Sequence, residues 1–312
     1  MNSYTAPLTY EQVETLRGIL DEHAFEFSSK PHAIFSAKRG KLSVTAYEKG
    51  PKILIQGKET EDFVKFTLEP QVLGEARLGY EEIHNPEQFE PHFGIDESGK
   101  GDFFGPLVIA GVYVDNEIAR RLIDAGIMDS KRISSAKRIR TLATTIRETP
   151  GCKWEMVSLG PERYNEMHEK FRNLNSMLAW GHARVIEKLH HTAPACPRAL
   201  SDQFARSELL QNALQKQGVS IQLDQRTKAE SDIAVAAASI LARERFVDWM
   251  EKTATAAGID LPMGASSAVV EAGRQLLHTH GQEALKRVAK MHFRTSKLVL
   301  GEESADTDQK NS

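Results

Sequence analysis

The stretch FGIDESGKGDFFGPLVIAGVYV, residues 93–114, decides how the rest of the chain is arranged. A short apolar approach leads to two adjacent acids, Asp96 and Glu97, and the chain then turns through two glycines around Lys100. The apolar run Leu107–Val114 predicts a buried strand. Adjacent carboxylates repel each other and gain nothing from lying near a core, so stability alone does not explain the pair. The stretch therefore predicts a metal site beside a loop that approaches phosphate.

The bulk composition permits two ordinary domains, because the chain has 312 residues and a hydrophobic fraction of 40%. Lys and Arg total 40 against 43 Asp and Glu, for a net charge of -3, so any polyanion must be bound by local patches. Cys152 and Cys196 have no paired spacing, which favours two reduced thiols. The sequence contains neither a membrane-length apolar run nor a secretory signal pattern, and we expect a cytoplasmic protein.

The N-terminal part predicts a small α+β domain. An amphipathic helix is expected over residues 8–25, where Thr9 and Gln12 have the spacing of a capping box. Three strand-like pieces separated by turn signals follow, and a second helix is expected after them. These pieces span residues 32–38, 41–47 and 52–55, with the helix at 59–68 and a polar linker at 83–92.

Five basic residues gather around the turns of this domain. They could contact a phosphate backbone, or they could protect strand edges from pairing with other chains. The sequence alone leaves these two interpretations equally open. The residues are Lys38, Arg39, Lys41, Lys49 and Lys52.

Two helices are expected in the middle of the chain. Residues 129–148 predict a helix capped by Ser134 or Ser135, with Lys131 in the turn before it, where a helix start favours an anion. Residues 173–191 predict a long helix whose Trp180 and His182 are interpreted as packing residues.

Further acids follow at the ends of predicted elements. A short apolar strand ends in Asp202, a position at which α/β sheets bring ligands. An alanine-rich helix is expected to begin at a Ser231 cap, with Glu230 just before it and Asp232 in its first turn. Acids at a helix start also have a structural explanation, because they complement the helix dipole. A four-carboxylate site needs at least one of these two.

Separate carboxylates suit Mg²⁺ or Mn²⁺, which take oxygen ligands and share their shell with substrate phosphate. Two such ions can activate a water on one side of a phosphodiester and stabilise the leaving oxygen on the other. Asp96, Glu97, Asp202 and either Glu230 or Asp232 supply the acids. The sequence has no serine triad in a matching context, no P-loop and no dinucleotide-binding glycine pattern.

The sequence resembles the ribonuclease HIII family. The strings GIDESGKGDFFGPLVIAGVYV, DSKRIS, NLNSMLAWGHA, SDQFA, TKAESDIAVAAASILAR and KMHFRTSK occur in that family's order, between Phe93 and Lys297. Ribonuclease HII is similar in catalytic layout but typically reads Asp-Glu-Ala-Gly-Arg-Gly at the first string. The N-terminal unit also resembles the TATA-binding-protein-like domain of the HIII branch.

This resemblance implies an RNase H-like catalytic domain with a mixed sheet and flanking helices. It implies cleavage of the RNA strand of RNA–DNA hybrids with Mg²⁺ or Mn²⁺, leaving 5′-phosphate and 3′-hydroxyl ends. Asp96, Glu97 and Asp202 correspond to the first three acids, and the flanking lysine and serine align Glu230 with the fourth. Asp232 is the alternative, because the fourth acid is Asp in many members of the family and Asp232 preserves that residue type.

The resemblance also implies substrate contacts. Ser98, Gly99, Lys100 and Gly101 would meet the ribose 2′-hydroxyl, by which RNA is told from DNA. Ser130 and Lys131 would meet a nearby phosphate.

We expect a monomer with a substrate-binding domain at 1–85, a linker at 86–92, a catalytic domain at 93–300 and a disordered tail at 301–312. Three alternatives remain at this point. The enzyme could incise single embedded ribonucleotides like ribonuclease HII, the fold could bind hybrids without cleaving them, or the N-terminal unit could bind a protein partner.

Overall fold

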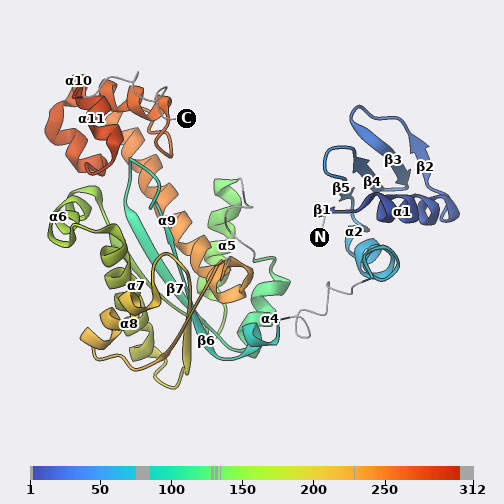
Figure 1. The fold of residues 1–312 in the computed structure, drawn as a ribbon, viewed down its shortest axis with the longest axis horizontal. Coiled ribbons are helices and arrows are strands. Elements are labelled where there is room, and N and C mark those ends of the chain that lie inside the picture. The colour runs from blue at the N-terminus through green and yellow to red at the C-terminus, as the bar shows by residue number, and fades with distance from the viewer. Residues whose placement is uncertain are drawn as a thin grey trace. The chain divides into compact units, whose positions relative to one another are not determined.

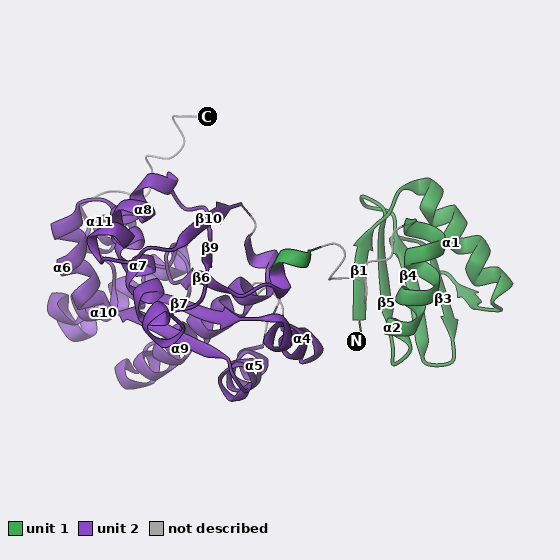
Figure 2. Ribbon diagram, turned by 90° about the horizontal axis from the view of Figure 1, so that it is seen from below, with its two compact units in different colours: residues 1–87 green, residues 88–312 purple. Residues whose placement is uncertain are grey.

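The computed structural model of the chain describes residues 3–74, 85–127, 130, 133, 135–227 and 229–302. The chain divides into two compact units, residues 1–87 and 88–312 (Figure 2). Within the described residues, no helix is both long and apolar enough to cross a membrane.

Unit 1 is built on a five-stranded antiparallel sheet with the order β1-β5-β4-β3-β2. The expectation of three strands was too low, because two short edge strands were missed. All three residues of β2 are exposed, so its sequence carries no burial pattern by which a strand could be recognised. The strands are β1 (Ser3–Pro7), β2 (Glu26–Ser28), β3 (Ala33–Arg39), β4 (Leu42–Tyr47) and β5 (Lys52–Gln56).

Two helical segments complete unit 1. Helix α1 (Tyr10–Glu22) begins with the expected capping box, in which Gln12 N donates to Thr9 Oγ1 and Thr9 N donates to Gln12 Oε1. The second segment starts as α2 (Thr60–Phe63) and continues as a π-helix, η1 (Val64–Leu73), in place of the single α-helix expected at 59–68. The small α+β domain expected from the sequence is confirmed.

Unit 2 contains a mixed five-stranded sheet with the order β10-β9-β6-β7-β8. Its central strand β6 pairs antiparallel with β7 on one side and parallel with β9 on the other. The mixed sheet with flanking helices agrees with the expected RNase H-like fold. The last strand in the sequence starts at Gln222. The strands are β6 (His92–Ser98), β7 (Leu107–Val114), β8 (Lys153–Leu159), β9 (Arg198–Asp202) and β10 (Gln222–Arg226).

Helices cover both faces of this sheet (Figure 1). One face packs against α9, with α4 and α5 beside it, and the opposite face packs against α7. Helices α4 and α6 were not predicted. The helices are α4 (Asn116–Asp124), α5 (Ala136–Glu148), α6 (Pro161–Phe171), α7 (Leu174–Thr192), α8 (Ser207–Lys216), α9 (Ile233–Ala257), α10 (Ser267–Val288) and α11 (Arg294–Leu300), with short 3₁₀ turns η2 (Pro86–Phe89) and η4 (Ala229–Ser231).

The alanine-rich helix α9 lies close against β6. A Cβ added at Gly94 would come within 2.2 Å of Val235 N and 2.6 Å of Ala234 Cβ. Only a glycine on the strand and small residues on the helix permit this approach. The start of α9 is therefore held tightly against the strand that carries Asp96 and Glu97.

Candidate active site

The alternation of side chains along β6 sends Asp96 and Glu97 to opposite faces of the sheet. His92 bonds to the residue that caps α9, and Gly94 lies against α9, so Asp96 belongs to the α9 face. Phe93 and Ile95 pack into the core that includes α7, so Glu97 belongs to that face. The two neighbouring carboxylates therefore lie on opposite faces of the sheet, Asp96 on the side of α9 and Glu97 on the side of α7.

Glu97 is held by two cationic or hydrogen-bonding groups. Its Oε2 lies 3.1 Å from His182 Nε2, and its Oε1 lies 3.3 Å from Lys100 Nζ. Burial by itself would raise the pKa of Glu97, but the His182 hydrogen bond and charge and the nearby Lys100 lower the pKa to about 2. Glu97 is therefore ionised at neutral pH.

His182 is a site residue that the sequence interpretation missed. It is fully buried in α7, as a packing residue would be, but its Nδ1 also lies 3.1 Å from Ser201 Oγ. The imidazole thus connects Glu97 on β6 to the end of β9. No local signal distinguishes it from a core histidine, because Glu97 lies 85 positions away. Trp180, interpreted in the same way, does pack against the core on this face.

Asp202 ends β9 beside the Asp-Glu pair. The parallel register sets Ile95 of β6 opposite Ser201 of β9, so the next residues along the two strands are Asp96 and Asp202. Asp202 Oδ1 accepts a hydrogen bond of 3.3 Å from Ala229 N, in the η4 turn that carries Glu230. Strand pairing and this hydrogen bond thus bring the ends of β6, β9 and η4 together.

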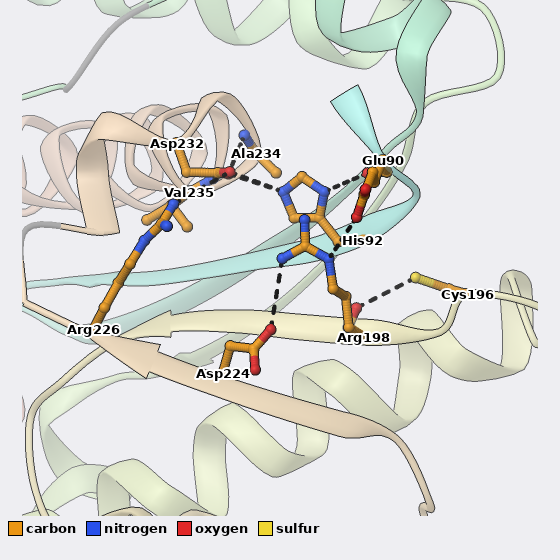
Figure 3. A network of polar contacts seen from close by, with 9 residues as sticks. All are labelled: Glu90, His92, Cys196, Arg198, Asp224, Arg226, Asp232, Ala234 and Val235. Atoms are coloured by element: carbon orange, nitrogen blue, oxygen red, sulfur yellow. Dashed lines mark hydrogen bonds and ion pairs between the residues drawn. The ribbon is translucent and has the colours of Figure 1, made fainter. Parts of the chain in front are cut away.

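Asp232 lies at the start of α9 in a network of polar contacts that includes His92 (Figure 3). Asp232 is the N-cap of α9, where its Oδ1 accepts from Ala234 N at 2.9 Å and Val235 N at 3.2 Å, and it contacts the buried His92. Ser231 was expected to be this cap, and that expectation was wrong. Asp232 is 2% exposed, whereas Glu230 is partly exposed.

The Gly-Lys-Gly turn uses its two glycines differently. Gly99 has φ +86°, and a Cβ there would come within 2.1 Å of Pro106 O. The fold therefore requires glycine at this position. A Cβ at Gly101 would meet no atom within 4 Å, so the fold does not require glycine there. The surface over Gly101 is open to a ligand backbone.

Buried Lys290 holds the backbone that directly follows this turn. Its Nζ donates to Asp102 O at 2.7 Å and to Phe104 O at 3.3 Å. Burial lowers the pKa of Lys290 to about 7, although Asp102 acts in the opposite direction. The turn therefore has little freedom to move away from the sheet.

Ser130 is buried and tied to α9. Its N donates to Ser239 Oγ at 3.2 Å, and its O accepts from Arg243 at 2.7 Å. Lys131, the other expected phosphate contact, lies outside the described residues. The expected cap of the following helix is Ser135, whose Oγ accepts from Arg138 N.

The donor chemistry of the four candidate acids suits a divalent metal ion. Carboxylate oxygens are the ligands that Mg²⁺ and Mn²⁺ prefer, and Asp96, Glu97, Asp202 and Glu230 are all partly exposed. Across the described ranges, no group of three or more His, Cys, Asp and Glu side chains lies close enough to hold one ion. The element ends converge, while side chains such as Glu97 are engaged by local partners.

A mixed sheet whose central and neighbouring strands end in carboxylates, with α9 across one face, defines the chain as an RNase H-like nuclease. A family model described as Ribonuclease HII matches residues 93–296, and a model described as a domain of unknown function (DUF3378) matches residues 7–72. The chain belongs to the ribonuclease HIII branch of the ribonuclease HII family and is a ribonuclease H, an endonuclease.

Its relatives are similar over nearly their whole length. Ribonuclease HIII of Protochlamydia amoebophila is 41% identical over 298 residues, covering 96% of this chain and 97% of the relative. Ribonuclease HIII of Chlamydia abortus is 44% identical, covering 90% and 91%. The crystal structure of Bst-RNase HIII in complex with Mn²⁺ superposes with a TM-score of 0.66 at 28% identity, covering 96% and 98%. The structure of Aquifex aeolicus RNase H3 superposes with a TM-score of 0.54 at 25% identity, covering 93% and 99%.

Proposed function

We propose that the protein hydrolyses the RNA strand of RNA–DNA hybrids by two-metal-ion catalysis, leaving 5′-phosphate and 3′-hydroxyl ends. The observation that carries this proposal is the convergence of the ends of β6, β9 and η4, with Asp202 bonded to the turn that bears Glu230. The relatives named ribonuclease HIII and the Mn²⁺ complex of one of them support it.

Asp96, Glu97, Asp202 and Glu230 would hold the metal ions. Bound Mg²⁺ or Mn²⁺ supplies a water activated for attack on phosphorus and stabilises the leaving oxygen. The contribution of the chain is to position these acids and to keep the Glu97 carboxylate ionised. His182 and Lys100 do this for Glu97, since they lower its pKa to about 2.

Glu230 is the better candidate for the fourth acid. A metal ligand needs access to solvent and substrate, and Glu230 is partly exposed, whereas Asp232 is buried. Asp232 also already accepts two backbone hydrogen bonds at the start of α9 and contacts His92. We therefore assign Asp232 to the structure of the helix start.

The Gly-Lys-Gly turn would recognise the ribose. Ser98 to Gly101 would contact the 2′-hydroxyl through backbone groups, and the open surface over Gly101 permits such an approach. Lys100 of this turn lies 3.3 Å from Glu97 and 5.8 Å from the centre of the Phe204 ring, so its positive charge lies beside the acids. Ser130 and Lys131 would contact a neighbouring phosphate.

The N-terminal residues 1–85 would bind the substrate through the basic turns of their sheet. The five basic side chains of these turns are exposed, which a phosphate contact requires. Arg39 is partly committed elsewhere, because its Nη1 donates to His23 O and its guanidinium lies over Phe25. Deleting residues 1–85 should weaken hybrid binding, and unchanged affinity would favour a protein-binding role.

The remaining proposals concern the context of the enzyme. We propose a monomer that acts in the cytoplasm, with a catalytic domain at 93–300, a linker at 86–92 and a tail at 301–312. An end-labelled RNA–DNA hybrid incubated with and without Mg²⁺ or Mn²⁺ tests the activity. Metal-dependent cutting that Asp96→Asn abolishes is expected, and tight hybrid binding without products would instead indicate a non-catalytic binding protein.

A further inference from the structure

A cavity of about 540 Å³ lies in unit 2 between the first turns of α10 and the start of α11. This volume is within the range of small-molecule sites, about 300–1,000 Å³. None of the four candidate acids lines it. The cavity is therefore a separate feature of the catalytic unit whose ligand can be inferred from its lining.

One side of the cavity favours an anion. The N-cap of α10 is Ser266, whose side chain makes no capping hydrogen bond, and Ser266 and Ser267 both line the cavity. The start of a helix carries unsatisfied N–H groups and partial positive charge. Arg274 and Arg294 line the same space and add two cationic groups.

Thr295 gives an independent indication of a ligand. It lines the cavity and is only 4% exposed, yet its hydroxyl makes no hydrogen bond within the described part of the chain. The neighbouring Ser296, also buried, donates to Met291 O and Phe293 O. The Thr295 hydroxyl has no partner among the described residues and lines the cavity, so it is available to a ligand oxygen there.

The cavity adjoins the Gly-Lys-Gly turn. Gly264, next to the cavity residue Ala265, donates from its N to Asp102 Oδ1 at 2.6 Å, and its O accepts from Phe103 N at 2.9 Å. Asp102 directly follows Gly101. A strand bound over the turn would therefore extend towards the start of α10.

We propose that this cavity binds one nucleotide of the bound nucleic acid. Its phosphate would meet the start of α10, Arg294 and Thr295, and its sugar or base would lie against Phe293, which also lines the cavity. This inference rests on the proposed function. The same chemistry would suit a free nucleoside monophosphate, but the connection to the Gly-Lys-Gly turn favours a backbone nucleotide of the hybrid.

The cavity also contains one acid, exposed Glu271 on α10. This carboxylate would oppose a bound phosphate, so its neutralisation should strengthen binding. An increase in affinity on neutralising Glu271 would distinguish a phosphate site from a site for a cation or an apolar ligand. Glu283, an exposed acid on the same helix that pairs with Lys286, does not line the cavity and serves as its control.

The test measures binding of a fluorescent RNA–DNA hybrid to the full chain without divalent metal, over a series of salt concentrations. Arg294→Ala should weaken binding about tenfold and reduce the slope of log K against log salt by about 0.9, the loss of one phosphate contact. Arg287→Ala removes an exposed arginine of α10 outside the cavity and should change the slope less. Thr295→Val should weaken binding, and Glu271→Gln should strengthen it relative to Glu283→Gln. Thermal melting verifies that each variant is folded.

Folded Arg294→Ala and Thr295→Val proteins with wild-type affinity and salt slope would overturn the proposal. Titration with adenosine 5′-monophosphate distinguishes the two ligand sources. Binding of the mononucleotide that is lost in Thr295→Val, with an unchanged hybrid slope, would overturn the backbone assignment. A wild-type protein that neither binds nor cleaves hybrids overturns the proposed function as well. If the wild-type protein cleaves hybrids normally and the Arg294→Ala and Thr295→Val variants bind them with unchanged affinity, only the cavity assignment is overturned and the proposed function stands.

Discussion

His92 Nε2 lies 3.0 Å from Asp232 Oδ1, and both side chains are fully buried. The contact joins the first residue of β6 to the cap of α9. Arg226 Nη2 lies 3.8 Å from the other Asp232 oxygen and places a positive charge beside this carboxylate. Asp232 is therefore fixed by the fold, and the preceding η4 turn with Glu230 ends at a defined position.

The first prediction separates the two candidate acids. Glu230→Gln should abolish turnover with little change in melting temperature, because a partly exposed side chain is altered. Asp232→Asn should keep most turnover per folded molecule but lower the free energy of unfolding by roughly 1–3 kcal/mol, since it disturbs the buried hydrogen bond to His92. Hybrid cleavage assays and urea unfolding of both variants test this. Inactive but fully stable Asp232→Asn would move the assignment to Asp232.

The second prediction concerns His182. Removing its imidazole in His182→Ala takes away a hydrogen bond and a charge that lower the pKa of Glu97. The pKa of Glu97 should rise, so the acid limb of the pH–rate profile should move to higher pH. His191→Ala is the matched control, because this exposed histidine of the same helix bonds to the backbone oxygen of Glu187 and, among the described residues, to no carboxylate. Identical acid limbs in His182→Ala and wild type would contradict the role of His182.

The third prediction follows from Lys290. Its folded-state pKa is about 7 and its ordinary value is 10.5, so between these pH values the unfolded chain binds more protons. The free energy of unfolding contributed by this residue should therefore increase as pH rises from about 7 to 10.5, by roughly 2–5 kcal/mol. Urea unfolding of wild type and Lys290→Met at several pH values measures it. If the free energies of unfolding of wild type and Lys290→Met changed in parallel between about pH 7 and pH 10.5, the effect would be excluded.

The fourth prediction compares the two glycines of the turn. Gly99→Ala should destabilise the fold, because it places a Cβ within 2.1 Å of Pro106 O at a positive φ. Gly101→Ala should leave the melting temperature unchanged, since its Cβ meets nothing within 4 Å. If substrate backbone approaches there, hybrid affinity should fall about tenfold, or roughly 1.4 kcal/mol. Unaltered affinity in Gly101→Ala would remove Gly101 from the substrate-binding surface.

Long periodic or strongly apolar segments could be predicted from the sequence. Strand β7 (Leu107–Val114) and helix α7 (Leu174–Thr192) both lie where the pattern indicated them. The short edge strands of unit 1 could not be predicted, because β2 is entirely exposed and β1 is mostly exposed. A strand whose side chains are mostly exposed has no alternation of apolar and polar residues from which it could be predicted.

The site required information that is distant in sequence. Ser231 and Asp232 are both good helix caps, and the choice depends on His92, 140 positions earlier. In the same way, His182 looks like a core residue until the fold brings Glu97 to it. The acids themselves could be proposed because each stands at the end of a predicted element.

The most direct measurement is metal-dependent product mapping on a continuous RNA–DNA hybrid and on a DNA duplex with a single embedded ribonucleotide. We predict that Mg²⁺ or Mn²⁺ permits cutting of the hybrid's RNA strand at internal positions, with 5′-phosphate and 3′-hydroxyl ends, and that Glu230→Gln gives no products. Efficient cutting of the single-ribonucleotide duplex with little cutting of the hybrid would contradict the proposed hybrid-specific activity.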